Sequence, residues 1–205
     1  KKAGVDGAAG RSRLAGTTAG AGAGAATDPS TALFLRKCGG CHPFEGHLKE
    51  RRGPDLTNWG SRVWLAAFLK APKTPDKYGF EESKFVAKGG MTAIDEPEEV
   101  KVYVEWILRE AGVPHDKKLA DQGRAAFDDN GCDQCHAIGG VAKGPDLKGW
   151  WSRAWIEKLL RDPADKHLYG ERNQMKVKSL SEEDRKVLVE WLVALRDKGA
   201  AAGKP

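Results

Sequence analysis

The sequence has no long hydrophobic run. Its longest apolar segments, Val63–Leu69 and Val187–Leu195, fall well short of the ~20 apolar residues that a membrane-spanning helix needs, and Glu190 interrupts the second. The apolar core of a signal peptide is missing as well. We therefore expect any export signal or membrane anchor to lie outside these 205 residues.

Cysteine and methionine are both scarce, with four and two copies. Four cysteines are too few for a small scaffold held together by disulfides. The net charge of +5 is mild for a nucleic-acid-binding protein, so we predict no nucleic-acid partner. Alternation of apolar and polar residues, the pattern of strands, is also missing. The expected fold class is all-α.

Residues 1–30 contain seven Gly and nine Ala without apolar periodicity. This composition is typical of a flexible linker. Two interpretations stay open: a disordered terminus, or a tether with a reach on the order of 30 Å.

From Thr31 onward the sequence repeats itself. The motif Cys-Gly-Gly-Cys-His returns as Cys-Asp-Gln-Cys-His, and Gly-Pro-Asp-Leu returns unchanged. From Trp59 to Tyr78 the second copy follows at a constant shift of 91 positions. Such a collinear series indicates a tandem duplication. We predict two domains, residues 31–112 and 113–205, with a hinge at 112–116.

Local signals predict short helices in both copies. Ser61 and Ser152 are candidate N-caps of apolar segments that stop before Pro72 and Pro163. The last helix of each copy has an apolar stripe, formed by Val100, Val104, Ile107 and Leu108, and by Val187, Leu188, Trp191, Leu192 and Leu195. Units of about 80 residues with three or four helices bury little core, so we expect something else to fill each unit.

All four cysteines lie in the repeated pattern Cys-x-x-Cys-His, at Cys38, Cys41, His42 and Cys132, Cys135, His136. This pattern is the attachment signature of c-type haem. Cysteines three residues apart share one face of a helical turn, so both thiols can reach one porphyrin while the next residue turns its imidazole to the iron. We predict two covalently attached haem c groups with His42 and His136 as iron ligands.

Three other interpretations of the cysteines compete with haem. A thioredoxin-like dithiol needs a strand–helix context that the sequence lacks. A zinc site would need two pairs that are 94 residues apart to meet. A structural disulfide is the simplest alternative. The recurrence of the complete motif within a matching repeat favours haem.

Met91 and Met175 occupy equivalent places, each before the last helix of its copy. Met and His are the usual sixth ligands of haem iron. A single Met usually fills a gap in a core, but two motifs need two ligands. We predict Met91 and Met175 as these ligands, with His167 as the competing candidate for the second haem.

Each copy resembles the class I c-type cytochromes. In that family a Gly-Pro-x-Leu turn supplies the carbonyl that orients the haem-ligating histidine. The resemblance implies that Pro54 orients His42 and that Pro145 orients His136. It further implies two tandem domains, each of three to four helices around a covalently bound haem.

The resemblance also implies a crossing of the first and last helices. Gly123 and Phe127 match the Gly-x-x-x-aromatic pattern, which would place them near Trp191. In the first copy Pro29 and Leu33 stand at these positions, so its first helix is expected to be short.

Other repeated residues are candidate donors to the haem propionates, by the same resemblance. The set comprises Trp59, Trp150, Arg62 and Arg153, with Tyr78 and Tyr169 as weaker candidates. The alternative is ordinary packing for the aromatic residues and surface charge for the arginines.

A haem whose two axial positions are both taken by protein can exchange electrons and has no open site for a substrate. We therefore expect an electron carrier that is no enzyme by itself. The repeated segment around Trp59 is most similar to dihaem c subunits of bacterial bc-type quinol:cytochrome c oxidoreductases. That similarity implies a cytochrome b or Rieske-type donor and a terminal oxidase or another cytochrome as acceptor. Membrane association would come through a partner or an anchor outside the sequence.

Two further functions compete with this one. A soluble dihaem shuttle of the cytochrome c4 type fits the size, and a dihaem peroxidase fits the cofactor count. The resemblance places all of these proteins in the bacterial periplasm or on the outer face of the cytoplasmic membrane.

Overall fold

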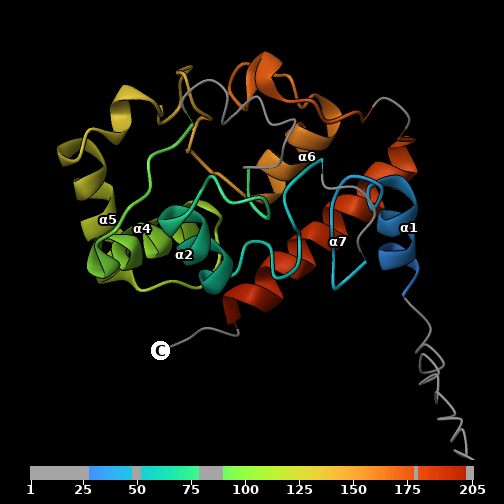
Figure 1. Ribbon diagram of the computed structural model, residues 1–205, viewed down its shortest axis with the longest axis horizontal. Helices are drawn as coiled ribbons and strands as arrows, with labels where there is room; N and C mark the ends of the chain where they lie inside the picture. Colours follow the sequence, from blue (N-terminus) through green and yellow to red (C-terminus); the bar gives the residue numbers. More distant parts are fainter. Residues whose placement is uncertain (1–27, 48–51, 79–89, 178–179, 202–205) are drawn as a thin grey trace, which may run out of the picture.

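The computed structural model describes residues 28–47, 52–78, 90–177 and 180–201. Over these residues the fold is all-α, as predicted, with no strand (Figure 1). The α-helices are α1 (Pro29–Lys37), α2 (Arg62–Lys70), α4 (Pro97–Glu110), α5 (Lys117–Asp129), α6 (Arg153–Arg161) and α7 (Glu182–Ala201). Two short 3-10 helices are η1 (Cys132–Gln134) and η2 (Gly170–Arg172). In the described part of the chain, no helix is long and apolar enough to span a bilayer.

Side-chain caps fix where the helices begin. The Ser61 hydroxyl accepts a hydrogen bond from the N–H of Trp64 at 3.0 Å, and Ser152 caps α6 in the same way. Both predicted caps are confirmed. Most of the predicted 1–30 linker lies outside the described residues. Its end is not a linker, because Asp28 caps α1 and Pro29 begins it.

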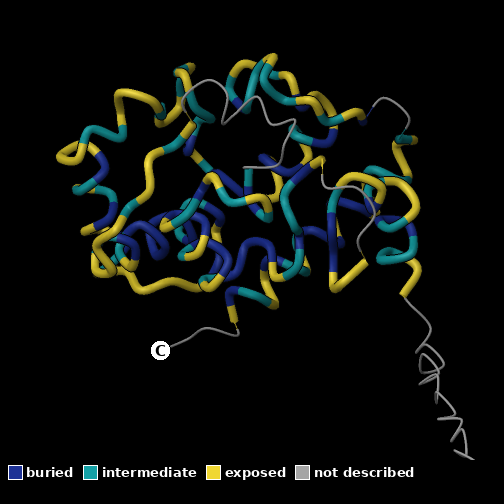
Figure 2. The backbone as a smooth tube through the Cα atoms, in the orientation of Figure 1, coloured by how far each residue is buried: buried dark blue, intermediate teal, exposed yellow. Residues whose placement is uncertain are grey.

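The apolar stripes form the inner faces of α4 and α7 (Figure 2). All four predicted positions of the α4 stripe are buried. On α7, Leu188, Trp191 and Leu192 are buried, whereas Val187 is 40% exposed. The prediction for Val187 is therefore wrong, because that position lies at the edge of the stripe.

The helices that begin the two predicted domains each pack on a helix of the other predicted domain. α5 packs against α4, and α1 packs against α7, at opposite ends of the molecule (Figure 1). Only residues 111–116 connect α4 to α5, and so short a connection makes the two helices an antiparallel hairpin. Gly112, with φ of +74°, provides the turn. The domain division at this point stays a prediction, because helix contacts cross it.

The α4–α5 crossing corrects one expectation. A Cβ at Gly123 would lie 2.2 Å from the carbonyl oxygen of Val102, so the two helix backbones are almost in contact. The ring of Phe127 lies 5.0 Å from that of Trp106. The predicted crossing near Trp191 is therefore wrong: Gly123 and Phe127 pack on the last helix of the first half.

Trp191 forms the other crossing, with α1. Its ring stacks on Phe34 at 4.3 Å, and its indole N–H donates to the hydroxyl of Thr31 at 2.9 Å. Leu33, the residue equivalent to Phe127, is buried nearby. α1 has nine residues against thirteen in α5, which confirms the expected short first helix.

Aromatic residues from both halves join these two ends. Tyr78 and Tyr169 occupy equivalent repeat positions, and their hydroxyl groups lie 3.1 Å apart. Around them, ring contacts link Trp59, Trp64, Phe68, Trp150, Trp151 and Trp155. The two copies thus share one central core.

Candidate haem sites

Each Cys-x-x-Cys-His motif forms a single helical turn. In the first copy the N–H groups of Cys41 and His42 both donate to the carbonyl of Cys38 at 3.0 Å. The second copy has the same two hydrogen bonds, at 3.1 and 2.9 Å, and begins with η1. The repeated motif therefore has a repeated backbone conformation.

A backbone carbonyl holds each histidine ring. The Nδ1 atom of His42 lies 3.0 Å from the carbonyl oxygen of Pro54, and that of His136 lies 3.0 Å from the carbonyl oxygen of Pro145. These are the contacts that the resemblance implied. A carbonyl can only accept, so each Nδ1 carries the proton and each Nε2 keeps a free lone pair. Such a contact is typical of metal-ligating histidines.

A glycine backbone lies directly against each imidazole. A Cβ added at Gly53 would lie 2.5 Å from the ring of His42, and one added at Gly144 would lie 2.6 Å from the ring of His136. No side chain fits between ring and backbone there. The glycine before each proline thus allows the ring to approach the carbonyl that orients it.

Burial sets the protonation of these groups. It lowers the pKa of His42 and of His136 below the ordinary value, despite the opposing hydrogen bonds to the proline carbonyls. Both rings are therefore neutral near pH 7, and the neutral imidazole is the form that binds a metal. Burial also raises the pKa of the Cys38 thiol to about 11 and raises that of Cys132.

No disulfide joins any of the four cysteines, all of which lie in the described part of the chain. The two motifs also lie far apart, because α1 leads into the first and α5 into the second, at opposite ends of the fold (Figure 1). Among the described residues, no group of three or more His, Cys, Asp or Glu could hold a metal ion. The geometry does not support the zinc and disulfide interpretations.

A cavity of about 980 Å³ opens beside the second motif. Cys132, Cys135 and His136 line it together with Met91 and Trp106. Its volume lies at the upper end of the range for sites of small molecules and cofactors. The indole N–H of Trp106 is buried and has no acceptor among the described residues. A neutral imidazole, two thiols and a thioether around a largely apolar cavity fit a covalently held haem.

The two predicted methionine ligands lie at different sites. Met91 lines the cavity beside His136, and Met175 does not. Met175 is half-buried against the core, and its N–H donates to the side chain of Asn173. The competing candidate, His167, does not line the cavity either, and its Nδ1 lies 3.0 Å from the carbonyl oxygen of Gly140.

The two predicted tryptophans also differ. Trp150 lines the cavity and stacks on Trp151 at 4.5 Å. Trp59 packs against the other side of this cluster, 4.6 Å from the ring of Trp151. Tyr78 and Tyr169 both line the cavity. Trp150 and the tyrosines thus lie where a group bound in this cavity would reach them. Trp59 does not line this cavity, and its role at the first haem stays a prediction.

The two predicted arginines bind protein groups. Arg62 donates to both carboxylate oxygens of Glu105, at 2.7 and 3.0 Å, and to the carbonyl oxygens of Pro114 and Ala200. Arg153 forms an exposed pair with Glu190. The predicted propionate role is therefore not supported for either arginine. Glu105 was not predicted as a functional residue, although its repeated Val-Glu-Trp context was a signal.

A comparison with protein families bears on the second motif. Residues 120–196, which include Cys132, Cys135 and His136, match the family model of cytochrome c. Residues 120–196 are a cytochrome c domain. Haem c and electron transfer are the properties of this family, and the cytochrome c domain contains one of the two cysteine pairs.

One curated relative matches part of the chain. Cytochrome c oxidase subunit 2 of Alkalihalophilus pseudofirmus is 32% identical over 115 residues. The match covers 49% of this chain and 32% of that protein, so the chain spans about a third of its relative's length. No solved structure matches the chain. The relative is a distant homologue, and its name is that of an oxidase subunit.

Proposed function

We propose that the protein is a dihaem electron carrier, with one haem c on each Cys-x-x-Cys-His motif. The observation that carries this proposal is the repeated histidine geometry. Both His42 and His136 lie 3.0 Å from a proline carbonyl, and both rings rest on a glycine backbone. The second motif lies in a cytochrome c domain, and the first has the same local construction.

The residues of each site have separate tasks. The cysteine thiols would hold the haem covalently, and the proline carbonyls fix the histidine tautomer that leaves Nε2 free to bind iron. The methionine thioether would be the sixth ligand, which raises the reduction potential. The haem supplies one-electron exchange at its iron. Because a histidine and a methionine of the chain itself would hold each haem iron, the chain would leave no coordination position for a substrate, which argues against a dihaem peroxidase.

The partners in this proposal are other respiratory redox proteins. We place the protein as the c subunit or domain of a bc-type quinol oxidoreductase, on the outer side of the bacterial cytoplasmic membrane. A cytochrome b or Rieske-type protein would be the donor. The distant relative named as an oxidase subunit supports a terminal oxidase as the acceptor.

Haem counting tests the cofactor assignment. The protein is produced in cells that attach haem c, denatured, and measured by mass spectrometry and haemochrome absorbance. We expect two covalent haems per chain. The Cys38→Ala/Cys41→Ala and Cys132→Ala/Cys135→Ala variants should each retain one. A wild-type chain with one covalent haem would refute the dihaem assignment.

Purification of the native complex tests the partner assignment. We expect the chain to co-purify from solubilised membranes with a cytochrome b or Rieske-type protein, and a quinol to reduce both haems within that complex. Isolation as a free periplasmic protein would favour the soluble shuttle instead.

A further inference from the structure

We infer that each haem site is completed by the opposite half of the duplication: Met91 is the sixth ligand for the haem on His136, and Met175 for the haem on His42. This inference rests on the proposed function. A cytochrome c domain followed along the sequence would pair His136 with Met175, because residues 120–196 contain both. The structure favours the crossed pairing.

The cavity beside His136 is built by both halves. The first half contributes Met91, Phe68 and Ile107, from the loop before α4 and from α2 and α4. The second half contributes the motif itself and Phe127 of α5. The thioether of Met91 thus shares one enclosure with the imidazole that needs a partner.

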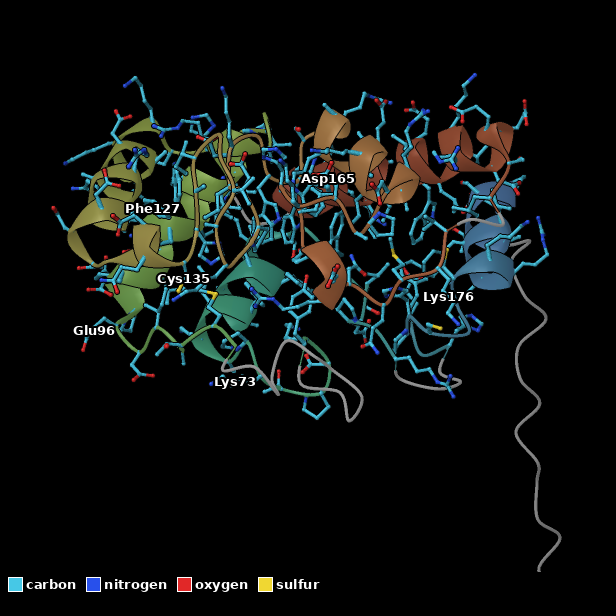
Figure 3. The ribbon with its side chains drawn as sticks, turned by 90° about the horizontal axis from the view of Figure 1, so that it is seen from above. Lys73, Glu96, Phe127, Cys135, Asp165 and Lys176 are labelled. Atoms are coloured by element: carbon cyan, nitrogen blue, oxygen red, sulfur yellow. The ribbon has the colours of Figure 1, made fainter. Side chains whose placement is uncertain are left out.

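Figure 3 shows the same division. Cys135, Phe127, Glu96 and Lys73 lie at one end of the molecule, and all four line this cavity. Lys176, the residue after Met175, lies at the other end, beside α1. The chain next to Met175 therefore lies at the end of the molecule where α1 leads into the first motif.

Packing around the first motif supports the pairing of Met175 with the haem on His42. Phe44, two residues after His42, lies 5.0 Å from the ring of Trp191 on α7. Phe34 stacks on the same ring. The first motif therefore lies against the last helix of the second half, which follows Met175 in the chain.

In this arrangement each haem site depends on residues from both halves of the chain. A change in the first half should alter the haem attached to the second half, and the reverse. The Tyr78–Tyr169 contact lies where the two halves meet, so the fold joins the sites at its centre as well as through the exchanged ligands.

Spectroscopy of single-haem variants tests the pairing. The Cys38→Ala/Cys41→Ala variant keeps only the haem on His136. In this background, Met91→His should abolish the Met–iron charge-transfer band and lower the reduction potential, whereas Met175→His should leave both unchanged. The Cys132→Ala/Cys135→Ala background should give the mirror result. Loss of the band with Met175→His in the first background would overturn the inference.

A second measurement uses the intact two-haem protein. In the reduced state, a ligating Met methyl has a strongly ring-current-shifted proton resonance. Met91→Leu should remove the resonance that persists in the Cys38→Ala/Cys41→Ala variant, and Met175→Leu should remove the one that persists in the Cys132→Ala/Cys135→Ala variant. The reverse assignment would refute the crossed pairing. A chain with no covalent haem would refute the proposed function instead, so the two failures are distinguishable.

Discussion

The two helix crossings involve segments that precede corresponding sequence motifs, but they are built differently. At the α4–α5 crossing, Gly123 lets the helix backbones meet, and Phe127 packs on Trp106. At the α1–α7 crossing, ring stacking and a hydrogen bond from Trp191 to Thr31 replace that close approach. A helix crossing can thus form without a glycine when an aromatic contact and a polar contact are present instead.

The repeated arginine–glutamate pair shows a similar divergence. Glu105 is buried and Arg62 is mostly buried, with side chains 7% and 12% exposed, and the N–H of Asp116 also donates to Glu105. Arg153 and Glu190, at the equivalent positions, are 47% and 64% exposed. The buried copy connects α2, α4 and the hinge, and its guanidinium also reaches the end of α7. The arginine–glutamate pair thus links helices in the interior of one half and lies on the surface of the other.

The largest loss of stability is expected when Glu105 is replaced. Glu105→Ala leaves Arg62 buried with only neutral carbonyl partners, and removal of one member of a buried pair costs about 3–5 kcal/mol. Glu190→Ala, the matched control, should leave the unfolding midpoint almost unchanged, because water solvates Arg153. Denaturant unfolding of both haem-loaded variants measures the difference. Equal losses would show that burial does not distinguish the two pairs.

A smaller effect is expected at the close helix contact. Gly123→Ala introduces a methyl group 2.2 Å from the Val102 carbonyl oxygen, so α4 and α5 must separate. Overpacking of this kind costs about 1–3 kcal/mol. The matched variant is Pro29→Ala, at the equivalent position of α1, where the residue lies in the first turn. Thermal unfolding should show a clear loss for Gly123→Ala and little for Pro29→Ala; a larger loss for Pro29→Ala would contradict the comparison.

Local signals made much of this molecule predictable. Ser61 and Ser152 cap helices because a hydroxyl before an apolar segment satisfies free N–H groups wherever the helix later packs. The histidine–proline contacts were implied by the resemblance to class I c-type cytochromes, and the residues involved lie close together in the chain. Sequence periodicity wrongly placed Val187 in the apolar stripe, because periodicity gives the direction of a stripe and not its width.

The exchange of helices was not predicted from the sequence. α1 and α5 precede corresponding motifs in the sequence, so the sequence alone allows each to pack on α4 or on α7. The short connection at residues 111–116 was the signal for an α4–α5 hairpin, because it leaves little chain for any other path. Once α5 packs on α4, α1 is left to pack on α7. The pairing of Met91 with its cavity depends on this tertiary choice, and no local pattern encodes it.

The smallest effect concerns the cap that holds α1 at its crossing. Asp28 accepts hydrogen bonds from the side chains of Ser30 and Thr31 and from their N–H groups, which lowers the pKa of its carboxyl to about 2. Asp28→Ala should cost about 1 kcal/mol near pH 7. Since the folded pKa lies below the ordinary value of 3.8, this stabilisation is complete above pH 4 and is lost as the pH falls toward 2. Asp28→Asn keeps the cap and should remove that pH dependence. A wild-type stability curve parallel to that of Asp28→Asn between pH 4 and 2 would show that the carboxylate does not secure α1 against Trp191.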